Sequence, residues 1–143
     1  MTQEDIDLLF KDLCARLPYG VKVKFAGYSG REDCTLNAQH LGSTYSIEYL
    51  RMKPYLRPMS SMTEEEKEEL KELCSIYIPT DSKNIGFEDY GILVLTHHLT
   101  DNSYNFKLNL NVVDWLNAHH FDYRGLIEKG LAIEVTSDNN PYK

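Results

Sequence analysis

The residues best suited to metal chemistry are two adjacent histidines and a nearby aspartate close to the C-terminal end. His119, His120 and Asp122 lie within DWLNAHHFDYRGLIEKGLA, residues 114–132. A closed zinc site takes about four ligands, and the chain has no spaced histidine pair such as His-x-x-x-His. We therefore predict no metal and no cofactor, and keep His119, His120 and Asp122 as the weaker alternative.

The same stretch has the outline of a helix-turn-helix at residues 111–135. Asn111 and Asp122 are residue types that begin helices, and an apolar strand pattern follows. The second helix would present two bases to DNA, Arg124 and Lys129, with acids beside them. The net charge of −7, from 22 acidic and 15 basic residues, works against binding to a phosphate backbone. Nucleic acid is thus an unlikely partner, and binding through this corner is the alternative function.

A third candidate is the segment RMKPYLRPM, residues 51–59. Tyrosine, arginine and methionine are enriched in protein–protein contacts, and two prolines stiffen the chain here and argue against a regular central strand. If the segment is an interface, the side chains of Tyr55 and Arg57 should be exposed. The other interpretation is a connector that packs its methionines and Leu56 onto a sheet. The predicted partner-binding residues are Arg51, Lys53, Tyr55, Leu56, Arg57 and Met59.

These candidates must be positioned by elements that the apolar pattern predicts in the order α-β-β-β-α-β-β-α-α-β. Helical spacing indicates helices at 3–17 and 63–77, the second begun by Thr63 with Glu66. Alternation indicates strands at 21–25, 35–41, 45–50, 90–96 and 104–111, with a hairpin turn at Gly42-Ser43. Two short helices and a final strand complete the pattern. The second of these helices is predicted to end at Gly130 in a left-handed conformation, and the strand to begin after it.

This order predicts a single α+β domain over residues 1–136, with a mainly antiparallel sheet flanked by short helices. Residues 137–143, rich in Asp, Asn and Ser, are predicted to be a frayed tail. There is no apolar stretch of the length that spans a membrane, and the first residues are acidic. We expect a cytoplasmic protein with no membrane partner.

Two blocks carry a resemblance to a known group. The strings KPYLRPMSSMTEEEKEEL (53–70) and VVDWLNAHHFDYRGLIEKGLAIE (112–134) resemble small uncharacterised proteins from phages and mobile elements of gut Bacteroidales. The resemblance implies an accessory role in a bacterial cytoplasm. It brings no activity, ligand or catalytic residue.

No phosphate-binding loop, dinucleotide fingerprint or nucleophile elbow is found in the sequence. We therefore assign no catalytic residue and do not predict an enzyme. The prediction is a non-enzymatic protein-interaction module that binds an unknown protein or a second copy of itself as a homodimer.

Overall fold

The computed structural model describes residues 1–25, 33–42, 47–49, 51–75 and 106–143. The chain begins with helix α1, Gln3–Arg16, as its apolar spacing predicts. Thr2 and Asp5 form a reciprocal capping box at its start, because each side chain accepts a hydrogen bond from the other residue's backbone N–H. The short 3₁₀ helix Leu17–Tyr19 follows, and Gly20, at φ 69°, turns the chain into the sheet.

Four short strands form one mixed sheet in the order β2-β1-β3-β4. They are β1 (Lys22–Phe25), β2 (Cys34–Thr35), β3 (Met52–Leu56) and β4 (Ile133–Glu134). β1 pairs antiparallel with β2 and β3, whereas β3 and β4 run parallel. The predicted α+β class with one mainly antiparallel sheet is confirmed.

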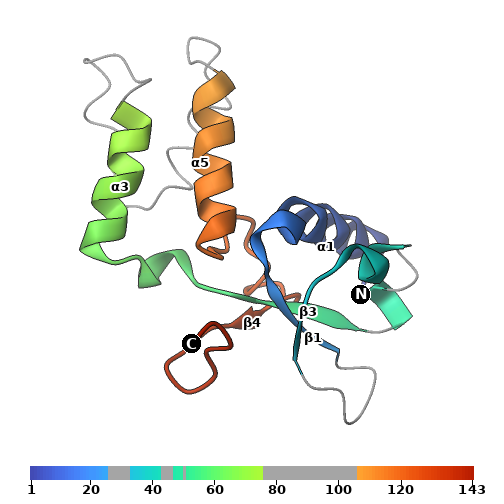
Figure 1. Ribbon diagram of the computed structural model, residues 1–143. Coiled ribbons are helices and arrows are strands. Elements are labelled where there is room, and N and C mark those ends of the chain that lie inside the picture. Colours follow the sequence, from blue (N-terminus) through green and yellow to red (C-terminus); the bar gives the residue numbers. More distant parts are fainter. Residues whose placement is uncertain (26–32, 43–46, 50, 76–105) are drawn as a thin grey trace.

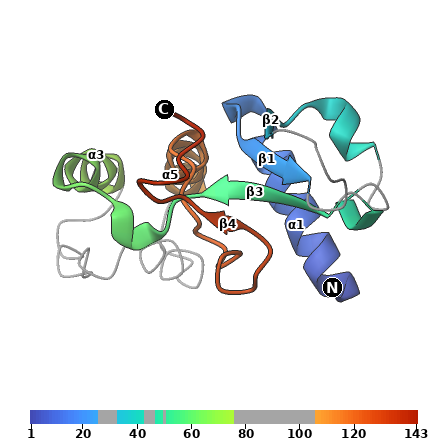
Figure 2. The ribbon, with the colours of Figure 1, turned by 90° about the horizontal axis from the view of Figure 1, so that it is seen from below.

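Helix α1 covers one face of this sheet (Figures 1 and 2). Leu9 and Leu13 of α1 are fully buried against Val21 and Val23, the inward residues at β1. We call this apolar core the sheet cluster. Its buried members are Leu9, Leu13, Val21, Val23, Phe25, Leu36, Ile47, Met52, Leu56, Leu126, Leu131 and Ala132.

Two helices stand side by side beyond the end of β3 (Figure 1). They are α3 (Glu64–Ser75) and α5 (Phe106–Ala118), and none of the described helices is long and apolar enough to span a membrane. Thr63 and Glu66 form the predicted capping box at the start of α3. The core between the helices, which we call the helix cluster, consists of Met59, Met62, Leu70, Val112, Leu116, Phe121 and Tyr123.

Three predicted strands are wrong where the structure describes them. In the predicted strand 35–41, only Thr35 is in a strand, as part of β2, which pairs with β1. Ala38–Leu41 is a 3₁₀ helix, and the Asn37 side chain accepts hydrogen bonds from the N–H groups at its start. Residues 47–49 are helical, so the described part of the predicted strand 45–50 does not form the second strand of a hairpin. Residues 106–111 begin α5, and Asn111 lies inside that helix rather than capping it. The predicted strand 90–96 lies outside the described residues.

The opposite error occurs at 51–59, where a predicted irregular connector contains the central strand β3. Leu56 C=O accepts a hydrogen bond from Val135 N–H at 2.8 Å, so the backbone N–H and C=O of Leu56 point toward β4. The backbone groups of successive strand residues point to alternate neighbours. Those of Tyr55 therefore point toward β1, and the Pro54 backbone points toward the β4 side again. Because β4 pairs only with Tyr55 and Leu56, the N–H that Pro54 lacks is not needed there.

Of the two short helices predicted near the C-terminal end, only the first is present, as part of α5. His120, at φ 61°, ends the turn after Ala118. No second helix follows, because Phe121 forms a β-bridge with Arg57 and residues 126–130 form a turn. Gly130 adopts the predicted left-handed conformation, φ 70°. Gly130 N–H bonds to Ile127 C=O at 3.0 Å and Leu131 N–H to Leu126 C=O at 2.8 Å, the bonding pattern of a Schellman motif.

The predicted frayed tail is also wrong, because residues 137–143 fold back onto the domain. The Asn139 side chain bonds to Glu134 C=O and Thr136 N–H, which closes a turn. Tyr142 then reaches the sheet, where its hydroxyl bonds to backbone groups of Lys22 and Tyr55. Long-range hydrogen bonds hold a segment whose composition alone suggested disorder.

Candidate functional site

The structure separates the six predicted partner-binding residues into a buried and an accessible group. Leu56 is fully buried, Tyr55 is 5% exposed and Met59 is 8% exposed. The expectation that Tyr55 is exposed is therefore wrong, because β3 is a central strand. Two basic residues of the segment remain accessible, exposed Arg51 and half-buried Lys53.

Arg57 is engaged inside the monomer. Its guanidinium makes a two-pronged contact with Glu66, with Nη1–Oε1 2.8 Å and Nη2–Oε2 2.9 Å. Burial favours a higher pKa for Glu66, but hydrogen bonds from Arg57 and from Thr63 N–H bring that pKa below its ordinary value. The Arg57 side chain is 22% exposed, so it serves to tie β3 to α3.

The same guanidinium is one end of a stack of planar groups in the helix cluster. Arg57 lies 4.2 Å from the centroid of Phe121. Phe121 stacks on Trp115 at 5.8 Å, and Trp115 on His119 at 4.0 Å. The indole Nε1–H of Trp115 donates to Glu69 at 3.2 Å. The tryptophan thus contacts two rings from the corner after α5 and one carboxylate of α3, which ties α3 to the C-terminal part of α5.

Three lysines gather on the sheet face opposite α1, and we call Lys22, Lys24 and Lys53 the basic face. Val21, Val23 and Phe25 point into the sheet cluster, so the alternate residues Lys22 and Lys24 point to the other side. Lys24 lies directly opposite Lys53 in the β1–β3 register. Within the described residues, neither Lys24 nor Lys53 makes an ion pair. Figures 1 and 2 show no described helix over this face.

Tyr55 lies on this face two residues after Lys53, and its side chain reaches from β3 across β1 to Asp33, the residue before β2. Its hydroxyl donates to Asp33 Oδ2 at 2.7 Å. Burial, with the adjacent Asp33 carboxylate, raises the pKa of Tyr55 to about 12. Tyr55 is a fixed hydrogen-bond donor here and not a proton-transfer group at neutral pH.

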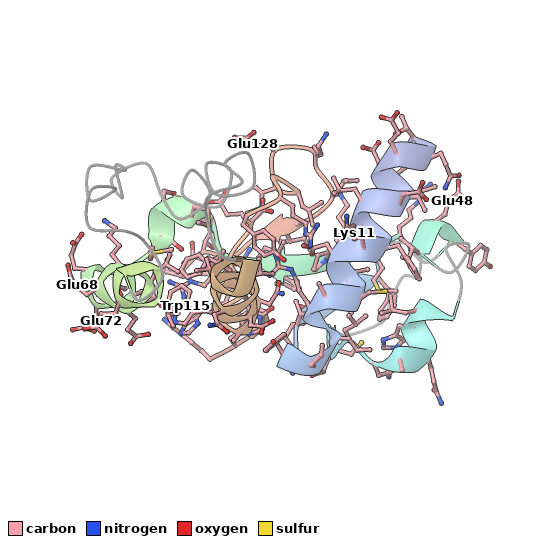
Figure 3. The ribbon with its side chains drawn as sticks, turned by 90° about the horizontal axis from the view of Figure 1, so that it is seen from above. Lys11, Glu48, Glu68, Glu72, Trp115 and Glu128 are labelled. Atoms are coloured by element: carbon pink, nitrogen blue, oxygen red, sulfur yellow. The ribbon has the colours of Figure 1, made fainter. Side chains whose placement is uncertain are left out.

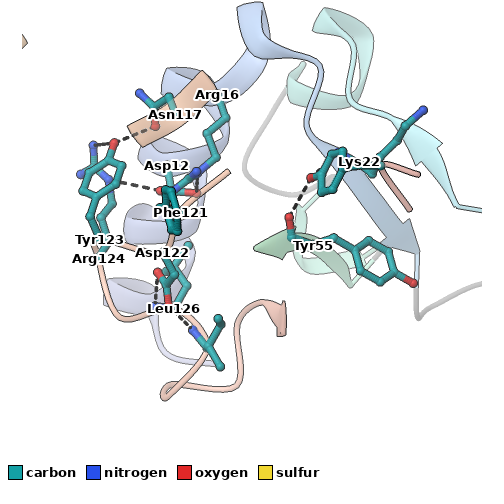
Figure 4. A network of polar contacts seen from close by, with 12 residues as sticks. Asp12, Arg16, Lys22, Tyr55, Asn117, Phe121, Asp122, Tyr123, Arg124 and Leu126 are labelled. Carbon is teal, nitrogen blue, oxygen red and sulfur yellow. Dashed lines mark hydrogen bonds and ion pairs between the residues drawn. The ribbon is translucent and has the colours of Figure 1, made fainter. Parts of the chain in front are cut away.

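Arg124, one of the two bases proposed to read DNA, is part of a buried network shown in Figure 4. Asp12 and Arg16 of α1 are both fully buried, and Arg16 Nε donates to Asp12 Oδ2 at 2.7 Å. Arg124 Nε lies 3.2 Å from the other carboxylate oxygen, Asp12 Oδ1. Arg16 Nη2 donates to Phe121 C=O at 2.7 Å, which connects α1 to the corner after α5.

Lys129, the second base, is exposed and close enough to Asp5 for its charge to help lower that carboxyl's pKa, after the larger effect of hydrogen bonds from Thr2. Because residues 121–130 form a β-bridge and a turn, no second helix carries Arg124 and Lys129. The predicted helix-turn-helix outline is therefore wrong, and the two bases are not presented together on a helix face.

The three residues of the metal alternative have separate contacts. His119 Nδ1 lies 2.9 Å from Trp115 C=O, to which only a protonated nitrogen can bond. Asp122 accepts hydrogen bonds from Leu126 N–H and Ile127 N–H with its two oxygens. His120 stacks on Tyr142. Among the described residues, no three His, Cys, Asp or Glu side chains are grouped so that they could hold a metal ion.

His120 combines an unusual backbone with an unusual environment. It is a non-glycine residue at φ 61°, and its ring lies 3.9 Å from that of Tyr142 at an interplanar angle of 7°. Burial lowers the pKa of His120 to about 4, with further lowering from the positive charges of Arg16, His119 and Arg57. Its Nδ1 is buried without a hydrogen-bond partner. The imidazole is neutral at physiological pH.

Sequence reasoning missed Lys22, Lys24 and Tyr142 as candidate site residues. The alternation in VKVKF predicted a strand, and its two lysines were the signal that could have marked a basic side. Their position opposite Lys53 depends on a register between distant segments. Tyr142 gave no signal, because its neighbours Asn140 and Pro141 are typical of loops.

Comparisons of the chain with protein-family models, with curated proteins and with solved structures find no match. The candidate site therefore stands on the geometry of this chain, and no family is assigned.

Proposed function

We propose that this protein is a non-enzymatic interaction module that binds an acidic segment of a protein partner on its basic face. The sequence resemblance supports a phage or mobile-element accessory role in a bacterial cytoplasm. The partner-binding residues in this proposal are Lys22, Lys24 and Lys53, flanked by Arg51. They replace the buried and internally bonded members of the segment 51–59.

The observation that carries the proposal is the Lys24–Lys53 pair. Like charges placed directly opposite in an antiparallel sheet are destabilising. This chain has 22 acidic residues, yet within the described residues neither ammonium group makes an ion pair. The carboxylate of Asp33, the next residue toward Lys24 in the β1–β2 register, bonds instead to the Tyr55 hydroxyl. An acidic partner segment would remove the repulsion and gain complementary contacts.

An acidic protein segment fits this face better than nucleic acid. Three lysines on a sheet face neutralise few phosphates, and the net charge of −7 on the whole chain repels the rest of a polyanion. A second copy of the chain is itself acidic and is one source of such a segment: Figure 3 shows Glu68 and Glu72 on α3. The homodimer is therefore one form of the same proposal.

The test is the single variant Lys24→Glu in the full chain. It should raise the free energy of unfolding by about 0.2–1 kcal/mol, because an opposite-charge pair replaces a like-charge pair. It should also weaken binding of a fluorescein-labelled polyglutamate peptide by about tenfold, roughly 1.4 kcal/mol. Urea denaturation and fluorescence anisotropy measure the two effects.

The matched control is Lys11→Glu, which changes the net charge equally on exposed α1 (Figure 3). It should leave both quantities near wild type. Equal peptide binding by Lys24→Glu and wild type would refute the proposal. Tighter binding of single-stranded DNA than of the peptide, lost in Lys129→Glu, would instead establish the nucleic-acid alternative.

A further inference from the structure

The C-terminal segment enters the sheet at one defined point of the β1–β3 ladder. β1 and β3 pair from Phe25↔Met52 to Val23↔Pro54, and one further step would place Lys22 opposite Tyr55. Leu36 N–H bonds to Val21 C=O at 2.9 Å, so Val21 faces β2 and Lys22 faces β3. Tyr55 faces β1, as shown above. Lys22 N–H and Tyr55 C=O are therefore the natural next partners in the ladder.

The Tyr142 hydroxyl occupies the place of that bond. It accepts a hydrogen bond from Lys22 N–H at 3.1 Å and donates one to Tyr55 C=O at 2.8 Å. Figure 4 shows Lys22 and Tyr55 on their neighbouring strands. One oxygen atom is thus inserted between two backbone groups whose register would let them bond directly.

The insertion point is also where β3 changes its neighbour. The next residue whose backbone groups point to this side is Arg57, just after β3, whose N–H and C=O bond to His120 C=O and Asp122 N–H, both at 2.8 Å. His120 is the residue on which the Tyr142 ring stacks. Tyr142 therefore fills the junction between β1 and the segment 120–122 along the same edge of β3.

Two arrangements of this junction satisfy the same backbone groups. With Tyr142 inserted, its hydroxyl bridges Lys22 and Tyr55; with Tyr142 withdrawn, Lys22 N–H can bond directly to Tyr55 C=O and the hydroxyl can bond to water. Exchanging such hydrogen bonds changes the free energy little. The balance then rests on the partial burial of the Tyr142 ring and its stack on His120.

We infer that Tyr142 is a displaceable wedge, and that its withdrawal extends the β1–β3 ladder by the pair Lys22↔Tyr55. Lys22 belongs to the basic face, so docking of the C-terminal segment sets the strand spacing at one end of that face. This regulatory consequence rests on the proposed function, whereas the wedge itself does not.

The experiment detects the inferred bond without any partner. In the full chain labelled with ¹⁵N and ¹³C, a scalar coupling through the hydrogen bond joins Lys22 N to Tyr55 C′ only when the two groups bond directly. In wild type, the main state has Tyr142 inserted and should show no such coupling. In Tyr142→Phe the coupling should appear. The matched control Tyr123→Phe also removes a buried hydroxyl, bonded to Asn117 at 2.9 Å, and should resemble wild type.

A folded Tyr142→Phe protein without the Lys22–Tyr55 coupling would overturn the inference, because the wedge would then be a fixed filler. If that variant does not fold, relaxation dispersion of wild type decides. Exchange on the microsecond-to-millisecond scale shared by the Lys22 and Tyr142 amides supports withdrawal, and flat profiles at both overturn it. Neither measurement involves the acidic peptide, so failure of the proposed function is distinguished from failure of the wedge.

Discussion

The sheet cluster and the helix cluster bury their side chains in different ways. The sheet cluster is mainly aliphatic, and α1 and β1 enter it with clear helical and alternating spacing. The helix cluster relies on two methionines and two aromatic residues, with the planar stack from Arg57 to His119 beside it. Aliphatic burial follows the period of an element, whereas planar stacking depends on residues brought together from several elements. Within the sheet cluster, α1 and β1 are correspondingly easy to predict from sequence, whereas β3 is not.

The largest expected effect on the two clusters comes from removing the Arg16–Phe121 hydrogen bond that connects them. Arg16→Met removes the bond to Phe121 C=O and leaves Asp12 buried with Arg124 as its remaining cation. We expect a loss of about 3–5 kcal/mol in the free energy of unfolding, because a buried charge loses its partner. Urea denaturation followed by fluorescence of Trp115, the chain's single tryptophan, and by circular dichroism measures it.

In wild type the two signals should change at the same urea concentration, because the Arg16 connection makes the clusters one cooperative unit. Asp12→Leu combined with Arg16→Met should recover most of the loss, since the one charge left without its partner is that of Arg124, which is 21% exposed to solvent. A loss below about 1 kcal/mol in Arg16→Met would mean that Arg124 alone satisfies Asp12.

A smaller effect separates stacking from charge inside the helix cluster. Arg57→Lys keeps the positive charge near Glu66 but loses the two-pronged contact and the planar stack on Phe121. We expect a loss of roughly 1–2 kcal/mol and a shift in Trp115 emission, because Phe121 also contacts the indole. The control Lys67→Arg alters a partly exposed cation on α3, the helix that carries Glu66, where it pairs with Glu64. Full stability of Arg57→Lys would show that charge alone holds β3 to α3.

The smallest expected effect is a pH dependence at the junction of the two clusters. The pKa of His120 is about 4 in the folded chain and near 6.5 when unfolded. Between these values the unfolded chain binds more protons, so stability falls as the pH falls from about 6.5 toward 4. With solvent screening at this partly exposed ring, we expect less than about 1 kcal/mol between pH about 7 and 5.5.

His120→Asn removes the titrating ring and retains a residue that tolerates positive φ. Its melting temperature should fall less than that of wild type over the same pH range. His119→Asn is the control for the neighbouring imidazole. Identical pH profiles for wild type and His120→Asn would exclude His120 as the source of the dependence.

Much of the fold follows from local signals, and the errors have local causes too. Thr2 and Thr63 cap their helices as predicted, and Gly130 ends its turn as predicted, because these motifs need only neighbouring residues. The alternation at 106–111 misled because residues four apart in such a run, such as Phe106 and Leu110, also share one face of a helix, so a short apolar run fits either element. Pro54 misled because a proline excludes a strand interior only where its N–H is needed.

Of the candidate site, the sequence contained Lys53 and Arg51 but not their arrangement. The Lys24–Lys53 pair arises from a register between segments about thirty residues apart, which no short window contains. Tyr142 depends on bonds across 120 and 87 residues of sequence. Local composition carries no trace of contacts this distant, so a loop-like tail was the natural but wrong prediction.

Pro54 also has a consequence for the folding pathway. β3 and β4 are joined through α3 and α5, and contacts so far apart in sequence form late. Until β4 arrives, the outer edge of β3 is open to pairing with other chains, the condition under which intermediates aggregate. Pro54 faces that edge and offers no N–H, so it interrupts the template during the interval when β3 lacks its neighbour. The residue that disguised the strand in the sequence thus protects it from aggregation while the protein folds.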